Sequence, residues 1–183
     1  MGGLAQNTKT RQKLGGGQWW RGSSQTRGAI RQADPEEPAR RTTLGSAVPS
    51  FFDTNILIYA VDEGETEKYE LSGELVEAHL VDGDGMISVQ VLREFYSAAR
   101  KLRRPLSDEQ ARAMVEYFST FRTLPEDTRM VLGAAQRSQE LVLSFWDALI
   151  VEAALKGGAD RLFTEGMQHG QLIEGMRVEN PFL

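Results

Sequence analysis

Four acidic residues stand beside bulky apolar residues in stretches that are far apart along the chain. The stretches are Phe51-Phe52-Asp53-Thr54-Asn55, Arg93-Glu94-Phe95, Phe145-Trp146-Asp147-Ala148 and Phe163-Thr164-Glu165. An ionised carboxylate is costly to remove from water unless a cation or hydrogen-bond donors compensate it. Four such positions in one chain therefore indicate a metal site.

An all-carboxylate ligand set selects a hard cation, Mg2+ or Mn2+, that keeps several of its water ligands. Such a cation orients and activates water for attack on a phosphodiester and offsets the charge that builds up on the phosphate. The chain has no cysteine, and its two histidines, His79 and His169, are too few and too scattered for a zinc site or for general acid-base cleavage. The acids therefore favour metal-dependent phosphodiester hydrolysis.

Two of the acids also have a purely structural interpretation. Asp53 could cap a turn by accepting an N-H from Asn55 or Ile56. Asp147 follows Ser144 by three residues, so the pair could form a capping box with Asp in place of the usual Glu. A carboxylate at a helix N-terminus can serve the helix dipole and a cation together, so both interpretations of Asp147 remain open.

The other two acids lie in different settings. Glu94 falls within an amphipathic helical pattern, where it could be a charge at the edge of the apolar stripe or a partner of Arg93 or Arg100. Glu165 follows a strand-like stretch and can point into a cleft at the strand end. We expect Trp146 in the core rather than as a surface on which bases stack.

Short apolar stretches that alternate with helical patterns must position these acids. We expect strands near 48–53, 85–88, 161–164 and 176–178, and helices that end near 82, run from Ser88 to about Leu102, begin near Ser107, cover 126–140, and extend from Ser144 to Gly157. Strands of this kind predict an α/β fold with a mostly parallel sheet. Ligands gather at the carboxyl ends of such strands, where Asp53 and Glu165 would lie.

Charge divides the 183 residues into two parts. Residues 1–47 hold 8 Lys/Arg against 3 Asp/Glu, whereas residues 48–183 hold 13 against 23. The first part shows no sustained periodicity, so we expect a disordered basic extension; its Trp19 and Trp20 could contact RNA or a partner. The second part is long enough for one core and too acidic for a non-specific duplex binder.

The sequence also indicates a location inside the cell. A chain without cysteine fits a reducing compartment, and neither a membrane-spanning apolar stretch nor the apolar segment of a secretory signal is visible. We therefore expect a cytoplasmic protein with no membrane partner.

Several motifs together resemble the PIN-domain ribonucleases of the VapC toxin type. The run from Phe51 to Ala60 resembles the opening of that family, Ile87 to Tyr96 its second motif, and Leu143 to Ile150 its third. The resemblance covers about Pro49 to Leu183 and implies a PIN-like fold of three layers, with a parallel sheet between helices on both sides. It also implies a metal-dependent endoribonuclease whose partner is a small antitoxin protein.

The resemblance assigns roles to individual residues. Asp53, Glu94 and Asp147 would be the catalytic acids that bind Mg2+ or Mn2+, and Glu165 is added as a possible further ligand. A supporting shell would come from Thr54, Asn55 and Thr164. Contacts to RNA phosphates would come from Arg93, Arg100 and Arg104. A homodimer is expected as well, through the apolar residues of the helices at Leu71 and Met114.

One position departs from the family pattern, because Gly166 stands where the family usually has a fourth acid. The alternative function is therefore a PIN-fold binding module that hydrolyses little RNA. A haloacid-dehalogenase-like phosphatase is disfavoured because Asn55 occupies the position of that group's general acid. A receiver-like signalling domain is disfavoured because this chain lacks the acidic pair before the phosphoacceptor position and the lysine near the late strands that such domains have.

Overall fold

Six strands form one sheet in the computed structural model, which describes residues 48–183; the predicted basic extension lies outside this range. The strands are β1 (Ser50–Phe52), β2 (Gly85–Ser88), β3 (Arg122–Leu124), β4 (Arg161–Phe163), β5 (Leu172–Ile173) and β6 (Met176–Glu179). Their order is β3-β2-β1-β4-β6-β5, and every neighbouring pair is parallel except β5 and β6. The predicted mostly parallel sheet is confirmed.

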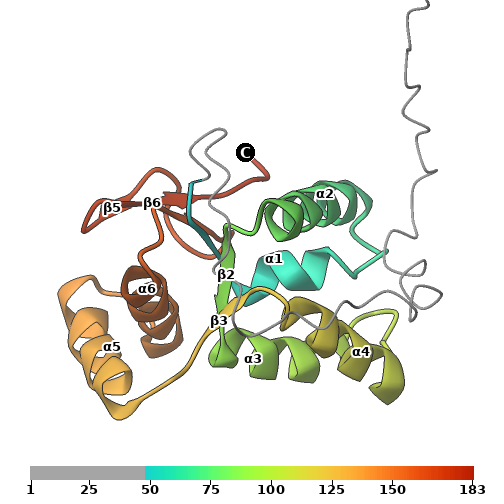
Figure 1. The fold of residues 1–183 in the computed structure, drawn as a ribbon, viewed down its shortest axis with the longest axis horizontal. Helices are drawn as coiled ribbons and strands as arrows, with labels where there is room; N and C mark the ends of the chain where they lie inside the picture. The colour runs from blue at the N-terminus through green and yellow to red at the C-terminus, as the bar shows by residue number, and fades with distance from the viewer. Residues whose placement is uncertain (1–47) are drawn as a thin grey trace, which may run out of the picture. The chain divides into compact units, whose positions relative to one another are not determined.

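Helices cover both faces of this sheet, as Figure 1 shows. They are α1 (Thr54–Tyr59), α2 (Thr66–Asp82), α3 (Val89–Ala99), α4 (Asp108–Phe118), α5 (Thr128–Glu140) and α6 (Phe145–Gly157). The chain steps from β1 to β2 to β3 in one direction and then crosses back to β4. Since parallel crossovers are right-handed, α1 to α4 lie on one face, and α5 and α6 lie on the other. The α/β fold of three layers agrees with the prediction.

Side-chain caps explain where several helices begin and end. The hydroxyls of Ser88, Ser107 and Ser144 accept a backbone N-H from the first turns of α3, α4 and α6. Gly83 and Gly158 close α2 and α6 in the left-handed conformation, which glycine adopts without steric cost. These boundaries agree with the prediction because each follows from local residue chemistry.

The core beside β1 is aromatic. The Phe52 ring lies 5.2 to 5.3 Å from the rings of His79, Phe121 and Phe163. A Cβ atom at Gly85 would lie 2.2 Å from the Phe121 ring, so only glycine fits at the start of β2. This packing holds the central strands at a fixed distance from α2.

Four features of the chain differ from the prediction. The Asp-Thr-Asn segment begins the helix α1 instead of forming a simple turn, and α3 ends at Ala99 rather than near Leu102. The short strands β3 and β5 were not predicted. Helix α2 buries Tyr69 and Val76, whereas Leu71, on the face expected to be apolar, is 41% exposed.

The predicted dimer surface needs a correction. Met114 is only 3% exposed, because α4 packs its apolar side against α3 of the same chain. Phe118 on the same side of α4 meets Phe95 edge to face, with ring centroids 4.9 Å apart. Met114 and Phe118 therefore belong to the core and are not available to a second copy.

Candidate active site

Asp53 lies where two neighbouring parallel strands end. It follows β1 directly, and Phe52 pairs with Phe163 at the end of β4, so Asp53 and Thr164 stand side by side. The Thr164 hydroxyl donates to Asp53 Oδ2 at 2.7 Å, and the Thr54 N-H donates to Oδ1 at 2.6 Å. Asp53 thus caps α1, as its structural interpretation required, although the backbone donor is Thr54 and not Asn55 or Ile56.

Asn55 completes the surroundings of this carboxylate. Its Nδ2 donates to Asp53 Oδ2 at 2.7 Å and to Thr164 Oγ1 at 3.2 Å, while its Oδ1 accepts the N-H of Glu165. The predicted supporting residues Thr54, Asn55 and Thr164 all lie against Asp53. Their hydrogen bonds fix the carboxylate at the point where the strand order reverses direction, the usual ligand position in parallel sheets.

Burial and neighbouring charges act together on Asp53. The residue is 8% exposed, and this burial raises its pKa from 3.8 to about 6, against the lowering effect of the bonds from Thr164 and Thr54. The negative charges of Glu94 and Asp147 raise the pKa further. Both acids therefore lie close enough to Asp53 for their charges to act on it.

Glu94 is held at both carboxylate oxygens. The Thr54 hydroxyl donates to its Oε2 at 2.7 Å, and Gln90 Nε2 donates to its Oε1 at 2.9 Å. Glu94 therefore has no ion pair with its neighbours: Arg93 bonds to Glu126 instead. Thr54 touches both Asp53 and Glu94, so one threonine links the acid after β1 to the acid on α3.

Asp147 lies in the first turn of α6. Ser144 Oγ accepts the Asp147 N-H at 3.1 Å and donates to Asp147 Oδ2 at 2.7 Å. The predicted cap is present, although the Asp carboxylate binds the capping hydroxyl rather than the backbone. In the same turn, the carbonyl oxygen of Trp146 accepts from Gln90 Nε2 at 3.3 Å, which ties the start of α6 to α3.

Glu165 faces away from the other acids. Its Oε1 lies 2.5 Å from Lys68 Nζ, and its Oε2 accepts from the Tyr59 hydroxyl. The Lys68 bond, followed by the Tyr59 bond, lowers the pKa of Glu165. Of the four predicted acids, the structure thus links Asp53 and Glu94 through Thr54, places Asp147 near enough for its charge to act on Asp53, and leaves Glu165 outside.

Gly166 leaves open space beside the site. A Cβ atom built there would lie 3.8 Å from both Asn55 Nδ2 and Thr164 Oγ1, an ordinary contact distance. No left-handed backbone requires glycine at this position. The fourth acid is therefore missing by residue type and not because the fold excludes a side chain.

The donor types and charges of the site fit a hard divalent cation. The charges of Glu94 and Asp147 act on Asp53, and no Lys or Arg among residues 48–183 forms an ion pair with Asp53, Glu94 or Asp147. In that range, no three acidic, His or Cys side chains are placed so that together they could hold a metal ion. Thr54 links Asp53 and Glu94 as a pair, whereas the Asp147 carboxylate is bonded to its capping residue Ser144.

The predicted phosphate contacts and the predicted core tryptophan lie on the surface. Arg93 pairs with Glu126, while Arg100 and Arg104 pair with Asp108 and Glu63. The assignment of Trp146 to the core is wrong, because this residue is 59% exposed beside Asp147. Its position in the first turn of α6 turns the indole outward while Ala148 and Leu149 point into the core.

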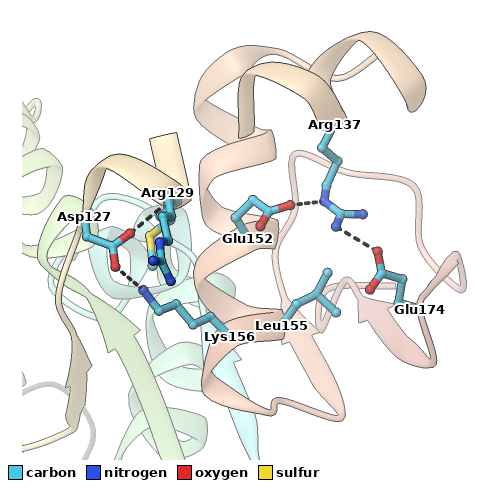
Figure 2. A pocket seen from close by; sticks show the side chains of 8 residues that line it. Asp127, Arg129, Arg137, Glu152, Leu155, Lys156 and Glu174 are labelled. Carbon is cyan, nitrogen blue, oxygen red and sulfur yellow. Dashed lines mark hydrogen bonds and ion pairs between the residues drawn. The ribbon is translucent and has the colours of Figure 1, made fainter. Parts of the chain in front are cut away.

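A hollow of about 400 Å3 lies elsewhere, between α5, α6 and the turn before β6 (Figure 2). Its charged side chains neutralise one another: Arg137 binds Glu152 and Glu174, and Lys156 binds Asp127. Because these pairs satisfy their own charges and none of the three clustered acids lines the hollow, it does not belong to the carboxylate site.

Two contributors were missed at the sequence level. Gln90 precedes Glu94 by four residues, a spacing that places both on one helix face and could have revealed their hydrogen bond. Lys68, which holds Glu165, gave no local signal because it lies 97 residues away along the chain.

Comparisons with known proteins agree with this architecture. The model of the PIN domain family matches residues 50–169. A crystal structure of DNA-bound VapBC from Salmonella typhimurium is 25% identical, covers 74% of this chain and 99% of its own, and superposes with a TM-score of 0.55. No curated protein matches the sequence.

Two further solved structures support the fold. A toxin-antitoxin complex from Klebsiella pneumoniae is 24% identical, covers 72% of this chain and 97% of its own, and has a TM-score of 0.53. VapBC2 from Rickettsia felis, bound to a DNA fragment from its promoter, is 21% identical with the same two coverages and a TM-score of 0.52. In residues 48–183, no helix is long and apolar enough to cross a membrane.

Proposed function

This chain belongs to the PIN domain family, and from that premise we propose that it is an endoribonuclease dependent on Mg2+ or Mn2+, the toxin of a type II toxin-antitoxin pair. The observation that carries the proposal is the placement of Asp53, bonded with Glu94 to Thr54, near enough to Asp147 for both negative charges to raise its pKa, with no cationic partner for the three acids among the described residues. At neutral pH, neighbouring ionised carboxylates in a partly buried site cost the fold free energy, and a bound divalent cation removes this cost.

The three acids would hold the cation, which when bound supplies a charge that activates water and offsets the charge on the scissile phosphate. Thr164 and Asn55 keep the Asp53 carboxylate in place at the strand end. Thr54 holds Asp53 Oδ1 through its N-H and Glu94 Oε2 through its hydroxyl. Fixed carboxylates keep their geometry during the reaction, which lowers the cost of reorganisation in the transition state.

RNA is the proposed substrate, and a small antitoxin is the proposed protein partner. The similar structures are toxin-antitoxin complexes, two of them bound to DNA, which supports a partner of that class. Arg93, Arg100 and Arg104 remain candidates for phosphate contact because their side chains are exposed, although each also pairs with an acid. A homodimer and a cytoplasmic location belong to the same proposal, with α2 and its exposed Leu71 as the remaining predicted surface.

A second candidate function is a PIN-fold module that binds RNA or the antitoxin but cleaves little. Two observations favour it. Gly166 supplies no fourth acid, and the Asp147 carboxylate is hydrogen-bonded to Ser144 instead of being shared with a ligand group of the other acids. Replacing Gly166 with Asp separates the two candidates, because only a weakened nuclease would gain cleavage activity.

The test is cleavage of a mixed RNA pool by the full chain with Mg2+, with Mn2+ and with EDTA. The Asp53→Asn variant provides the control for contaminating nucleases. Cleavage that needs metal and is lost in the variant would support the nuclease. A folded wild-type chain that leaves the RNA intact under all conditions would contradict it and favour the binding module.

A further inference from the structure

Gln90 is a buried polar residue between the two helices that carry Glu94 and Asp147. It lies in the first turn of α3 and is 1% exposed. Its amide nitrogen donates to Glu94 Oε1 at 2.9 Å and to the Trp146 carbonyl oxygen at 3.3 Å. One side-chain amide therefore binds a carboxylate on its own helix and the backbone of α6, next to Asp147.

These bonds complete a continuous path from Asp53 through Glu94 to the residue before Asp147. Asp53 binds the Thr54 N-H, the Thr54 hydroxyl binds Glu94, Glu94 binds Gln90, and Gln90 binds the residue before Asp147. Within the described residues, no other side-chain hydrogen bond joins α3 to the first turn of α6. We propose that Gln90 is a positioning residue, which sets the separation of Glu94 and Asp147 by tying α6 to α3; its role in metal binding rests on the proposed function.

The unused atom of the same amide supports a role beyond packing. Gln90 Oε1 is buried and has no hydrogen-bond partner among residues 48–183. An unmet buried acceptor destabilises a fold, so an apolar side chain of similar size would serve packing alone better. Packing alone therefore does not explain Gln90. Its side-chain nitrogen joins the two helices, and its side-chain oxygen provides a free acceptor beside the carboxylates.

A second glutamine in the chain shows what an ordinary pair looks like. Gln136 Nε2 donates to Glu140 Oε1 at 2.7 Å, with the same four-residue spacing on α5, but this pair is exposed. No second bond to another helix is formed there. The Gln136→Met variant is thus a matched control for Gln90→Met, since both remove a Gln-Glu bond and only one removes the link between helices.

The test compares these two variants of the full chain. Amide hydrogen exchange is measured over residues 145–149, and Mn2+ affinity is measured by calorimetry. We expect faster exchange and roughly tenfold weaker Mn2+ binding for Gln90→Met, in the range found when outer-shell partners of metal ligands are removed. Gln136→Met should match the wild type in both. Unchanged exchange in a folded Gln90→Met chain, or unchanged Mn2+ affinity where the wild type binds Mn2+, would overturn the proposal.

A measurement on the wild-type chain keeps the test valid if Gln90→Met does not fold. The side-chain NH2 signals of Gln90 are followed by NMR during a Mg2+ titration, and they should shift with the same midpoint as the backbone signals of Asp53 and Asp147. Shifts at the acids without a shift at Gln90 would overturn the positioning role. If the wild type binds no metal, the proposed function fails, but the link between the helices can still be tested. Slow hydrogen exchange of the Gln90 side-chain NH2 would support this link, and fast exchange would overturn it.

Discussion

Replacing the buried acid of the site should make the metal-free protein more stable. The pKa of Asp53 is about 6 in the folded chain against an ordinary 3.8, mainly because of burial. The folded state therefore holds a proton more tightly than the unfolded state. Well below pH 3.8 both states are protonated and no penalty exists; the penalty grows as the pH rises from 3.8 toward 6 and is nearly complete at about pH 7.

The magnitude follows from the difference between the two pKa values. At about 1.4 kcal/mol for each tenfold change in proton affinity, ionised Asp53 costs the fold about 3 kcal/mol at pH 7. Asparagine removes this charge but can satisfy only part of the three bonds from Thr54, Asn55 and Thr164, a loss of about 1 to 2 kcal/mol. Asp53→Asn should therefore stabilise the metal-free chain by roughly 1 to 2 kcal/mol.

The assay is urea unfolding of wild type and Asp53→Asn in EDTA at several values between pH 4 and pH 7.5. The difference between the two proteins should be small or reversed at pH 4 and should favour the variant above pH 6. Saturating Mn2+ should then reverse the order, since a cation at 100 times its Kd stabilises only a protein that binds it, by about 2.7 kcal/mol.

Asp127 provides a control with the opposite sign. It also caps a helix, α5, but its pKa is lowered, chiefly by the hydrogen bond from Lys156. Asp127→Asn should therefore destabilise the chain at pH 7, and the effect should fade as the pH falls toward the lowered pKa. A metal-free Asp53→Asn protein that is less stable than the wild type at pH 7 would refute the reasoning from desolvation.

Three further substitutions have defined outcomes. Gly166→Asp should tighten Mn2+ binding in calorimetry and speed RNA cleavage, because a Cβ atom there fits 3.8 Å from Asn55 Nδ2 and Thr164 Oγ1; no change would mean that three acids suffice if the wild type cleaves RNA, and would favour the binding module if it does not. Glu165→Gln should leave Mn2+ affinity unchanged because this carboxylate binds Lys68 and Tyr59, and a clear loss would place it in the site. Val142→Gly should raise the free energy of unfolding, measured with urea, by about 0.5 to 1 kcal/mol, since a 90% exposed β-branched residue with φ of 55° is strained; a lower free energy of unfolding would argue against that strain.

The parts of the fold that local chemistry determines were predictable. Serine caps before α4 and α6 and glycine after α2 and α6 place the helix boundaries, because each cap acts on its own turn. The acid after β1 was found for the same reason. In contrast, β3 and β5 have three and two residues, too few to show a period, and they depend on pairing with strands that are distant in sequence.

The side-chain environment of the site was less predictable than its residues. Trp146 looks like a core residue in sequence because its neighbours are apolar, but a helix turn of 100° per residue puts it outside while Ala148 points inward. The helix α1 was hidden because Asp-Thr-Asn is also typical of a turn. The direction of Glu165 depends on Lys68, a contact that only the complete fold creates.

The long-range contact between Asp53 and Thr164 has a consequence for the newly made chain. These residues are 111 positions apart, and β4 must emerge from the ribosome before it can pair with β1. Early fragments carry Asp53 and Glu94 but lack both Asp147 and the strand that fixes the first acid. Since domains fold as units during synthesis, the acid cluster assembles only when nearly all of the chain has been translated. Under the proposed function, an incomplete polypeptide therefore cannot cleave RNA near its own site of synthesis.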